Sequence, residues 1–399
     1  MMITYANQRI KLQPTHSQIQ KLMQQAGATR YVYNWALNER MKFYEVNKSL
    51  LPTSELSKQL TQLKRCPEKM WLNEAIAQSL QQSLRDLDHA YYNFLSHRTQ
   101  IPKFKSRHKV APSFKVPQEV RILDTKVYCP KIGWIAAYEG CYTEGKTKGA
   151  RFKRDTCGDW WVTVTTEFEI DDSPLDSPTK ALGIDLGLES FITTSDGVKV
   201  PPLKSYRKAE LRLKREQRKF SRKKKGSKNR EKQRIKLARA HRKVARQRSD
   251  YLHKLSHSLV KQYDFIAVED LNVKGLARTK LAKSIHDAGW GEFVRQLEYK
   301  CLWNRKHFVR IDRFAPTSKT CSVCGIKKEK MPLSVRTWGC ECGAIHDRDT
   351  NAAKNILALG LKAAGHVVTA CDQPSGQPTT TLGGVSVRLE ALAAESSSR

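Results

Sequence analysis

Three carboxylic acids lie in segments that could bring them to one site. Asp185 lies in the run 180–194, whose alternation predicts a strand, a tight reversal and a second strand. Glu269 ends the apolar strand predicted over 263–269, and Asp349 opens the helix predicted from 347. Carboxylates from separate segments are what two divalent cations, about 3.5–4 Å apart, require to hydrolyse a phosphodiester in line. The three acids therefore predict a metal-dependent nuclease that uses Mg²⁺ or Mn²⁺.

The residues around these acids predict packing on one side and free space on the other. Strand alternation divides the first segment into two faces, with Leu182, Ile184 and Leu186 on one and Gly183, Asp185 and Gly187 on the other. We expect the glycines to leave room beside Asp185 for a metal ion and a phosphate. The helix face of Asp349 carries residues that can pack closely on a sheet, namely Ala352, Ala353 and Ile356. Asp347 or Asp349 could instead be only the N-cap of this helix.

Two close pairs of cysteines, each followed by glycine, predict a structural zinc site. The ligands would be Cys321, Cys324, Cys340 and Cys342. The second pair is C-x-C rather than C-x-x-C, which predicts a tighter knuckle. Four thiolates leave no open coordination position, so His346 is not needed as a ligand. The remaining cysteines show no pairing pattern. In a reducing compartment we expect them to be unpaired and buried, as small apolar residues are: Cys66, Cys129, Cys141, Cys157, Cys301 and Cys371.

The charge of the chain predicts a polyanionic partner. Lys and Arg number 72 against 39 Asp and Glu, which gives a formal net charge of +33. Segment 204–248 alone holds 22 Lys or Arg and 3 Asp or Glu, a net charge of +19. A turn-like cluster at 223–230 divides it into two helices, and we expect a hairpin over 204–261 that contacts phosphates. Its second helix has a predicted apolar seam of Ile235, Ala238, Ala245, Leu252, Leu255 and Leu259. No apolar run suits a membrane span or a signal peptide.

The first half of the chain predicts helices enclosed by strands. An extended segment precedes residue 15, and apolar residues at helical spacing run from Leu72 to Phe94. Tyr31, Tyr33 and Trp35 could stack on bases, although a place in the core is the commoner fate of helical aromatics. Short strands then recur up to about residue 178. Residues 140–147 match a phosphate-binding loop, but strands follow where that loop needs a helix, which argues against ATP binding.

Four motifs together resemble the TnpB family of bacterial insertion sequences. They are Gly183-Ile-Asp-Leu-Gly187, Val268-Glu-Asp-Leu271, Ser318-Lys-Thr-Cys-Ser-Val-Cys-Gly325 and Asp347-Arg-Asp-Thr-Asn-Ala-Ala353. The match spans about residues 180–360, and Arg30-Tyr-Val-Tyr-Asn-Trp35 and Pro102-Lys-Phe-Lys-Ser106 extend it more loosely. By this resemblance the catalytic residues and magnesium ligands are Asp185, Glu269 and Asp349, with Asp349 preferred to Asp347.

The resemblance implies an α/β chain with a split nuclease domain of ribonuclease-H (RuvC-like) fold. This domain would occupy 179–313 and 346–362, around a zinc ribbon at 314–345. A β-barrel wedge domain would comprise 1–14 and 111–178 and carry a helical recognition insertion at 15–110, which the family describes as helix-turn-helix. Residues 363–399 are expected to be a disordered tail. The resemblance also implies a guide RNA, a DNA target, a cytoplasmic place at the bacterial nucleoid, and a separate transposase of the same element as a further partner.

Two other functions are compatible with these residues. A strand-transferring transposase could use the same triad, whereas a tyrosine transposase is disfavoured because no His-x-His pair occurs. A non-catalytic zinc-containing regulator that binds DNA is the second alternative. The presence of all three acids argues against it, because no structural role demands unpaired carboxylates in a cluster.

Overall fold

The computed structural model describes residues 1–141, 144–171, 173, 178–202, 205–271, 289–332 and 334–365. The chain divides into two compact units, Met2–Ile170 and Asp171–Arg399, the latter together with Met1. The expected tail over 363–399 falls almost wholly outside the described residues. Within the described part of the chain, no helix has the length and apolar character needed to cross a bilayer.

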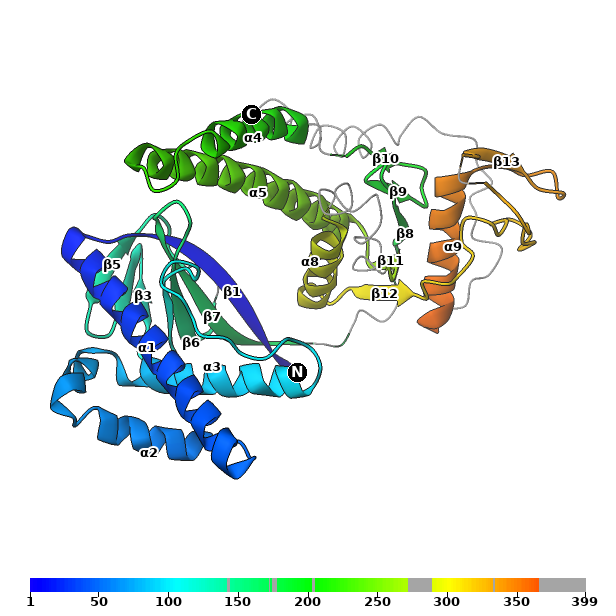
Figure 1. The fold of residues 1–399 in the computed structure, drawn as a ribbon. Coiled ribbons are helices and arrows are strands. Elements are labelled where there is room, and N and C mark those ends of the chain that lie inside the picture. The colour runs from blue at the N-terminus through cyan, green and yellow to red at the C-terminus, as the bar shows by residue number, and fades with distance from the viewer. Residues whose placement is uncertain are drawn as a thin grey trace. The chain divides into compact units, whose positions relative to one another are not determined.

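The N-terminal unit contains a seven-stranded sheet in the order β2-β6-β7-β1-β5-β4-β3 (Figure 1). Its strands are β1 (Met2–Gln13), β2 (Ser113–Val116), β3 (Arg121–Leu123), β4 (Lys126–Cys129), β5 (Gly133–Ala137), β6 (Lys146–Arg154) and β7 (Trp160–Ile170). The strand predicted to follow the loop-like match is present as β6, although it begins inside the match, at Lys146. The expected barrel is not closed, because β2 and β3 remain the two edges of the sheet within the described residues.

Helices pack against this sheet and against one another. They are α1 (His16–Asn47), α2 (Thr53–Leu63), the 3₁₀ helix η1 (Pro67–Glu74) and α3 (Ala77–Leu95). Thr15 begins α1 with a capping box in which Gln18 is the partner. The prediction of one helical stripe from Leu72 was wrong in one respect: Leu72 is buried in η1, and Ile76 caps the separate helix α3. Tyr33 is buried in the helical core, and Tyr31 and Trp35 pack against it.

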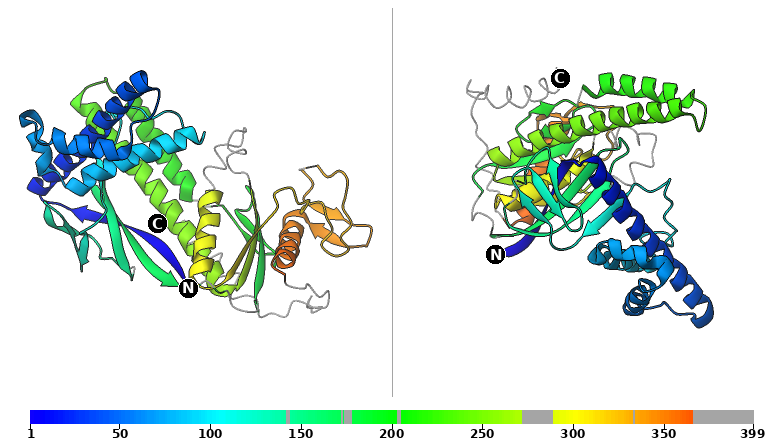
Figure 2. Two further views of the ribbon diagram at one scale, coloured as in Figure 1. Left: turned by 90° about the horizontal axis from the view of Figure 1, so that it is seen from below. Right: turned by 90° about the vertical axis from the view of Figure 1, so that its left-hand side faces the viewer.

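The C-terminal unit has three layers, with helices on both faces of a five-stranded sheet (Figures 1 and 2). The sheet order is β10-β9-β8-β11-β12. Its strands are β8 (Ala181–Leu186), β9 (Ile192–Thr194), β10 (Lys199–Val200), β11 (Phe265–Glu269) and β12 (His307–Ile311), and its helices are α4 (Ser205–Ser221), α5 (Lys228–Gln262), α8 (Trp290–Trp303) and α9 (Arg348–Ala363). The antiparallel pairing of β8 with β9 confirms the predicted strand, reversal and strand.

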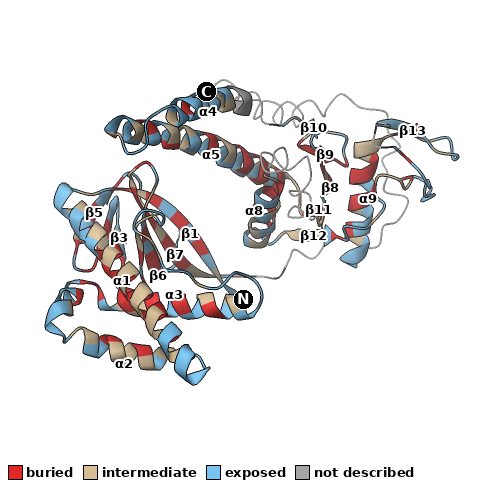
Figure 3. Cartoon of the chain, viewed as in Figure 1, coloured by how far each residue is buried: buried red, intermediate tan, exposed pale blue. Residues whose placement is uncertain are grey.

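The two faces of this sheet hold different cores. One face packs Leu182, Ile184 and Val268 against residues of α5 and α8. The other packs Phe265 and Ala267 against α9, whose sheet-facing side is buried (Figure 3). Alternation along β8 and β11 therefore decides which side chains meet α9.

The basic segment forms the predicted hairpin of α4 and α5. Ser227 caps α5 by accepting a hydrogen bond from the backbone N–H of Arg230. Between the two helices, the buried Gln233 amide donates to the Glu216 carboxylate at 2.7 Å. The predicted seam was wrong at Ala245, which is exposed, because Val244 takes the buried position.

Candidate active site

The sheet brings Asp185 and Glu269 to neighbouring positions. β8 and β11 run parallel, and Ile184 lies opposite Val268, so the next residue of each strand is one of the two acids. Both acids follow the alternation of the face that α9 covers. Asp270, the acid after Glu269, instead forms an ion pair with Arg313. The predicted meeting of Asp185 and Glu269 thus follows from strand register.

The close approach of α9 places Asp349 over this face. A Cβ added to Gly183 would lie 2.1 Å from the carbonyl oxygen of Ala353 and 2.8 Å from Leu357 Cβ. Asp349 lies one helical turn before Ala353, and Asp185 lies two strand residues after Gly183. The space that we expected Gly183 to leave for a metal ion and phosphate is therefore filled by the helix. This glycine is needed for helix packing.

The raised pKa of Asp185 indicates that the three acids lie close together. Burial, the Asp349 carboxylate and the Glu269 carboxylate raise the pKa of Asp185 to about 7, while Arg348 acts in the opposite direction. Burial also raises the pKa of Glu269. Three like charges in a half-buried site repel one another, and a cation would relieve this repulsion.

The structure gives Asp347 a different role from Asp349. The Asp347 carboxylate caps α9 by accepting from the backbone N–H of Thr350 at 3.0 Å. It also forms an ion pair with Lys199 at 2.8 Å. The carboxylate of Asp347 therefore already serves as the N-cap of α9 and as the ion-pair partner of Lys199.

A cation that the sequence did not single out lies beside Asp349. The Arg336 guanidinium is 2.8 Å from Glu189 and 3.7 Å from the Asp349 carboxylate. Its carbonyl accepts from the backbone N–H of Arg348 at 2.8 Å. Arg336 lies between the two cysteine pairs, so only its place in that loop could have drawn attention to it.

The four predicted cysteines come together. Their sulfur atoms all lie within 4.8 Å of one another, with Cys321 at 3.7 Å from Cys342 and Cys324 at 3.5 Å from Cys340. A tetrahedral zinc with Zn–S bonds of about 2.3 Å requires sulfur separations of about 3.8 Å. The Cys₄ cluster therefore fits a zinc ribbon. The short strands β13 (Thr337–Gly339) and β14 (Ile345–Asp347) form its hairpin.

Local backbone bonds shape both knuckles of the cluster. Gly325 donates its N–H to the carbonyl of Cys321, and Gly343 donates to that of Cys340, both at 2.9 Å. Outside the cluster, His346 Nε2 lies 3.0 Å from Cys321 Sγ, a suitable position for a hydrogen bond that supports a ligand. Of the scattered cysteines, Cys66 is exposed, which contradicts its expected burial.

Two buried asparagines on α9 join the cysteine cluster to the acids. Asn351 accepts from the backbone N–H of Ser322 at 2.9 Å and donates to the carbonyl of Thr320 at 2.7 Å. Asn355 donates to the carbonyl of Thr317 at 2.7 Å. Because Asn351 is two residues after Asp349, one helix fixes both the first cysteine pair and the third acid. The sequence signal that could have revealed this link is the pair of asparagines, Asn351 and Asn355, four positions apart on one face of the helix.

The acid site is more open than the cysteine cluster. Among the described residues, the cysteines form the one group of three or more ligating side chains whose ligand atoms all lie within 4.8 Å. The three carboxylates are near enough to raise the pKa of Asp185 but do not close around one point.

Models of known families match three parts of the chain. One described as "Probable transposase" matches residues 162–280, one described as "Cas12f1-like, TNB domain" matches 290–356, and one described as "Helix-turn-helix domain" matches 1–49. Among solved structures, a chain of a Cas12f1-sgRNA-target DNA complex matches with a TM-score of 0.56 at 15% identity. The match covers 85% of this chain and 82% of that one, which establishes a Cas12f-like α/β fold.

Curated relatives match over almost the entire chain. A Streptomyces pristinaespiralis protein named "Putative RNA-guided DNA endonuclease" is 39% identical over 89% of each chain. The Escherichia coli K12 protein named "Putative RNA-guided DNA endonuclease InsQ" is 34% identical over 93% of this chain and 95% of its own. Identity of this extent, together with the transposase and Cas12f1-like models, shows that the chain belongs to the TnpB family.

Proposed function

We propose that this protein is a transposon-encoded, RNA-guided DNA endonuclease with a RuvC-like active site formed by Asp185, Glu269 and Asp349. The observation that carries the proposal is the convergence of three acids from two parallel strands and one helix, with the pKa of Asp185 raised to about 7. Such a cluster destabilises the chain unless cations bind to it. A nuclease needs this arrangement, and a scaffold does not.

Each acid has a distinct part in the proposed site. Asp185 and Glu269, one strand apart, would share the bound cations, and Asp349 would complete their coordination from α9. Two Mg²⁺ or Mn²⁺ ions would activate the attacking water and stabilise the leaving oxygen. Ionised Asp185 is the ligand form, so the bound cation must displace its proton at pH values below about 7.

The guide and target are proposed from the relatives and from charge. The relatives' names describe RNA-guided DNA endonucleases, and the matched Cas12f1 chain was solved with a guide RNA and target DNA. The α4–α5 hairpin supplies a dense positive surface for phosphates. Target choice would rest on base pairing, with the protein reading backbone shape and a short flanking motif. A protein acting on bacterial DNA would work in the cytoplasm, at the nucleoid.

The finer organisation belongs to the same proposal. The nuclease domain would comprise 179–313 and 346–362, the zinc ribbon 314–345, the recognition helices 15–110 and the wedge strands 1–14 and 111–178. The acid-bearing sheet with α9 supports the first assignment, and the Cys₄ cluster supports the second. The separate transposase of the element remains a proposed partner.

The test is guided cleavage with matched carboxylate variants. The protein would be purified with RNA expressed from its own locus, and that RNA would be sequenced. Plasmids bearing matched targets would then be incubated with Mg²⁺ and wild type, Asp185→Asn or Asp347→Asn. We expect a loss of at least about 10³-fold for Asp185→Asn, as for removal of a catalytic group. Asp347→Asn should cleave, because asparagine also caps a helix.

Three outcomes would contradict the proposal. Tight nucleic-acid binding without cleavage, across targets and metals, would favour a non-catalytic regulator. Joined rather than cut strands would indicate a strand-transferring transposase. Equal activity of wild type and Asp185→Asn would locate the active site elsewhere.

A further inference from the structure

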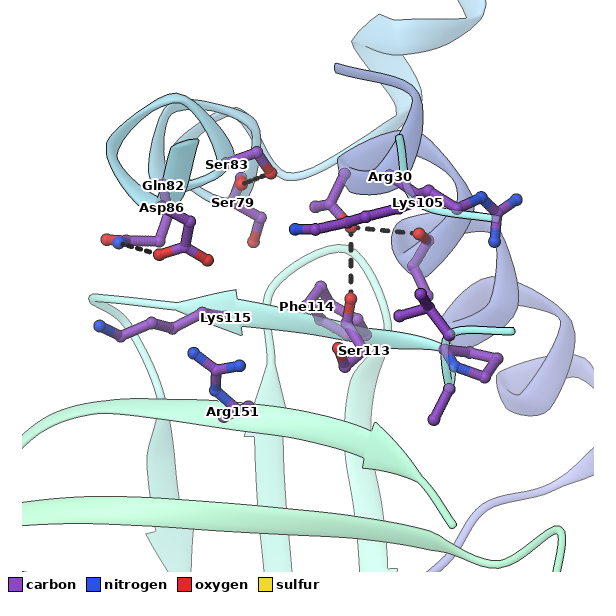
Figure 4. Close-up of a pocket in the computed structure, with 15 residues that line it drawn as sticks. Arg30, Ser79, Gln82, Ser83, Asp86, Lys105, Ser113, Phe114, Lys115 and Arg151 are labelled. Atoms are coloured by element: carbon purple, nitrogen blue, oxygen red, sulfur yellow. Dashed lines mark hydrogen bonds between the residues drawn. The ribbon is translucent and has the colours of Figure 1, made fainter. Parts of the chain in front are cut away.

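A polar pocket in the N-terminal unit lies far along the chain from the acids. Residues from α1, α3, the segment at 105–113, β2 and β6 line it. In Figure 4, α3 lies on one side of this space and strands β2 and β6 on the other. None of the three predicted catalytic acids belongs to its lining.

Two cations lie directly opposite each other at its edge. Lys115 of β2 is the cross-strand partner of Arg151 of β6, and both are exposed. Like charges opposite each other destabilise a strand pair. Neither side chain forms an ion pair with any acid in the described part of the chain. Figure 4 shows the Arg151 guanidinium pointing toward α3, while the Lys115 side chain runs along its own strand at the edge of the same space. An anion between sheet and helix would convert this repulsion into attraction.

A third cation extends across the pocket. Asn34 fixes the backbone of Lys105 through bonds of 2.8 Å to its N–H and 3.0 Å to its carbonyl. The Lys105 ammonium lies 3.3 Å from the centre of the Tyr33 ring. Burial lowers the pKa of Lys105, Asp86 raises it, and Arg151 lowers it further. A bound anion would favour the charged form of Lys105 and so oppose the effects of burial and Arg151 on its pKa.

A buried hydroxyl has no partner beside these cations. Ser79 is 1% exposed, and its Oγ forms no hydrogen bond. In Figure 4 the oxygen points into the space that Lys105 and Arg151 also face, whereas Arg30 points away from it. Unsatisfied buried hydroxyls are uncommon and costly. An acceptor in the pocket, such as a phosphate oxygen, would satisfy this one.

One acid lies among these groups and limits what can bind. The Asp86 carboxylate accepts from the Gln82 amide at 2.9 Å and favours the charged form of Lys105. With Lys105, Lys115 and Arg151 present, the local charge remains positive. A singly charged anion suits this balance better than a highly charged one.

We propose that this pocket binds one phosphodiester group of a nucleic-acid backbone, held by Lys105, Lys115 and Arg151 and by the hydroxyl of Ser79. The proposal rests on the proposed function only for the presence of nucleic acid. The pocket would add a contact in the N-terminal unit that positions the nucleic acid through its backbone, whatever its base sequence. The phosphodiester can come from the RNA or from the DNA.

Salt-dependent binding of two polymers tests the pocket. The full chain, as wild type and as Lys115→Gln/Arg151→Gln, is titrated with labelled duplex DNA and, separately, with labelled single-stranded RNA. Each lost phosphate contact lowers the slope of log affinity against log salt by about 0.9 for duplex DNA and about 0.7 for single strands. Between roughly 50 and 200 mM salt, the loss of this one phosphate contact means that wild type should lose about 3.5-fold more affinity for duplex than the variant.

The control is Arg65→Gln/Lys126→Gln, which removes the same two residue types at exposed positions outside the pocket. Its slopes should match those of wild type. The pocket variant should melt no lower than wild type, since its substitutions relieve repulsion.

The outcomes separate the source of the phosphate and can overturn the proposal. A slope change with only one polymer identifies that polymer as the source, and a change with both means that the pocket accepts either. Unchanged salt slopes for both polymers, or an equal change in the control variant, would refute the proposal that the pocket binds a phosphodiester. Cleavage is not needed for the measurement, so failure of the nuclease proposal would leave this result intact.

Discussion

The cysteine cluster and the acid cluster are both attached to the start of α9, yet they are assembled differently. The cysteine ligands arise from two short knuckles, closed by local bonds of Gly325 and Gly343, and their sulfurs lie within 4.8 Å. The acids come from segments at least 80 residues apart and remain more widely spaced. A site built locally is fixed by its own loops, whereas a site built from distant elements depends on the packing between them.

The difference extends to energetics. Structural zinc contributes its binding free energy to folding, and four thiolates enclose it fully. The three carboxylates repel one another, as the raised pKa of Asp185 indicates. The close packing of α9 on β8 must offset the free-energy cost of this repulsion. The first site should therefore stabilise the chain and the second should weaken it. Five predictions test this contrast.

The largest effect is expected from removing a zinc ligand. Cys340→Ser should reduce bound zinc from about one ion per chain to none, because structural zinc contributes about 10 kcal/mol or more to its folding unit. Since Asn351 and Asn355 fasten the ribbon to α9, cleavage should also be lost. Elemental analysis and plasmid cleavage measure both. The control is Cys66→Ser, an exposed cysteine outside the cluster. Zinc retained at full stoichiometry in Cys340→Ser would exclude this residue as a ligand.

The next effect concerns the packing that delivers Asp349. Gly183→Ala would place a Cβ at 2.1 Å from the Ala353 carbonyl oxygen, so α9 must shift. Overpacking of this kind costs about 3 kcal/mol, and the shift should also reduce cleavage. Urea unfolding measures the loss of stability.

Gly291→Ala is the matched control for this change. A Cβ at Gly291, in α8, meets nothing within 4 Å, and alanine favours helix by about 1 kcal/mol. We expect this variant to be at least as stable as wild type. Equal stability of Gly183→Ala and wild type would mean that α9 does not approach β8 as closely as described.

The contrast also explains which features could be predicted from sequence. The cysteine spacing is a local signal, and it identified all four members of the cluster. Alternation placed Asp185 and Glu269 on strands, but the space beside Gly183 was misjudged because α9, 170 positions later, fills it. Arg336 and Asn351 were missed because their roles depend on folded neighbours. The open sheet of the N-terminal unit differs from the expected barrel for the same reason: closure depends on pairing between distant edge strands.

A smaller effect is expected from pH. The pKa of Asp185 is raised from 3.8 to about 7, so the folded chain binds a proton that the unfolded chain has lost. Without divalent cations, the contribution of Asp185 to the free energy of unfolding should therefore fall as pH rises from about 4 to 7 and then level off. Asp185→Asn should lack this fall. Urea unfolding of both proteins across pH measures the difference between them, and a difference that does not change with pH would contradict the raised pKa.

Activity should show the same ionisation with the opposite sign. Cleavage should rise with pH about tenfold per unit below the midpoint, because ionised Asp185 binds the cation. Since cation and proton compete, raising Mg²⁺ should move the midpoint to lower pH. If the midpoint pH of cleavage did not change with the Mg²⁺ concentration, the pH profile would report the ionisation of another group.

The smallest effect is expected at Arg336, where the two sites meet. Its guanidinium, 3.7 Å from Asp349 and about half exposed, competes weakly with a cation for that carboxylate. Arg336→Gln should lower the half-saturating Mg²⁺ concentration by at most about fivefold, the equivalent of about 1 kcal/mol for an exposed pair. The shift should shrink as salt rises, because salt screens exposed charges. Arg305→Gln, which breaks a comparable exposed pair with Asp171, should leave the Mg²⁺ requirement unchanged. If Arg336→Gln instead raised the Mg²⁺ requirement, the arginine would help to hold Asp349 in position, and the zinc-bearing loop would contribute directly to the order of the acid site.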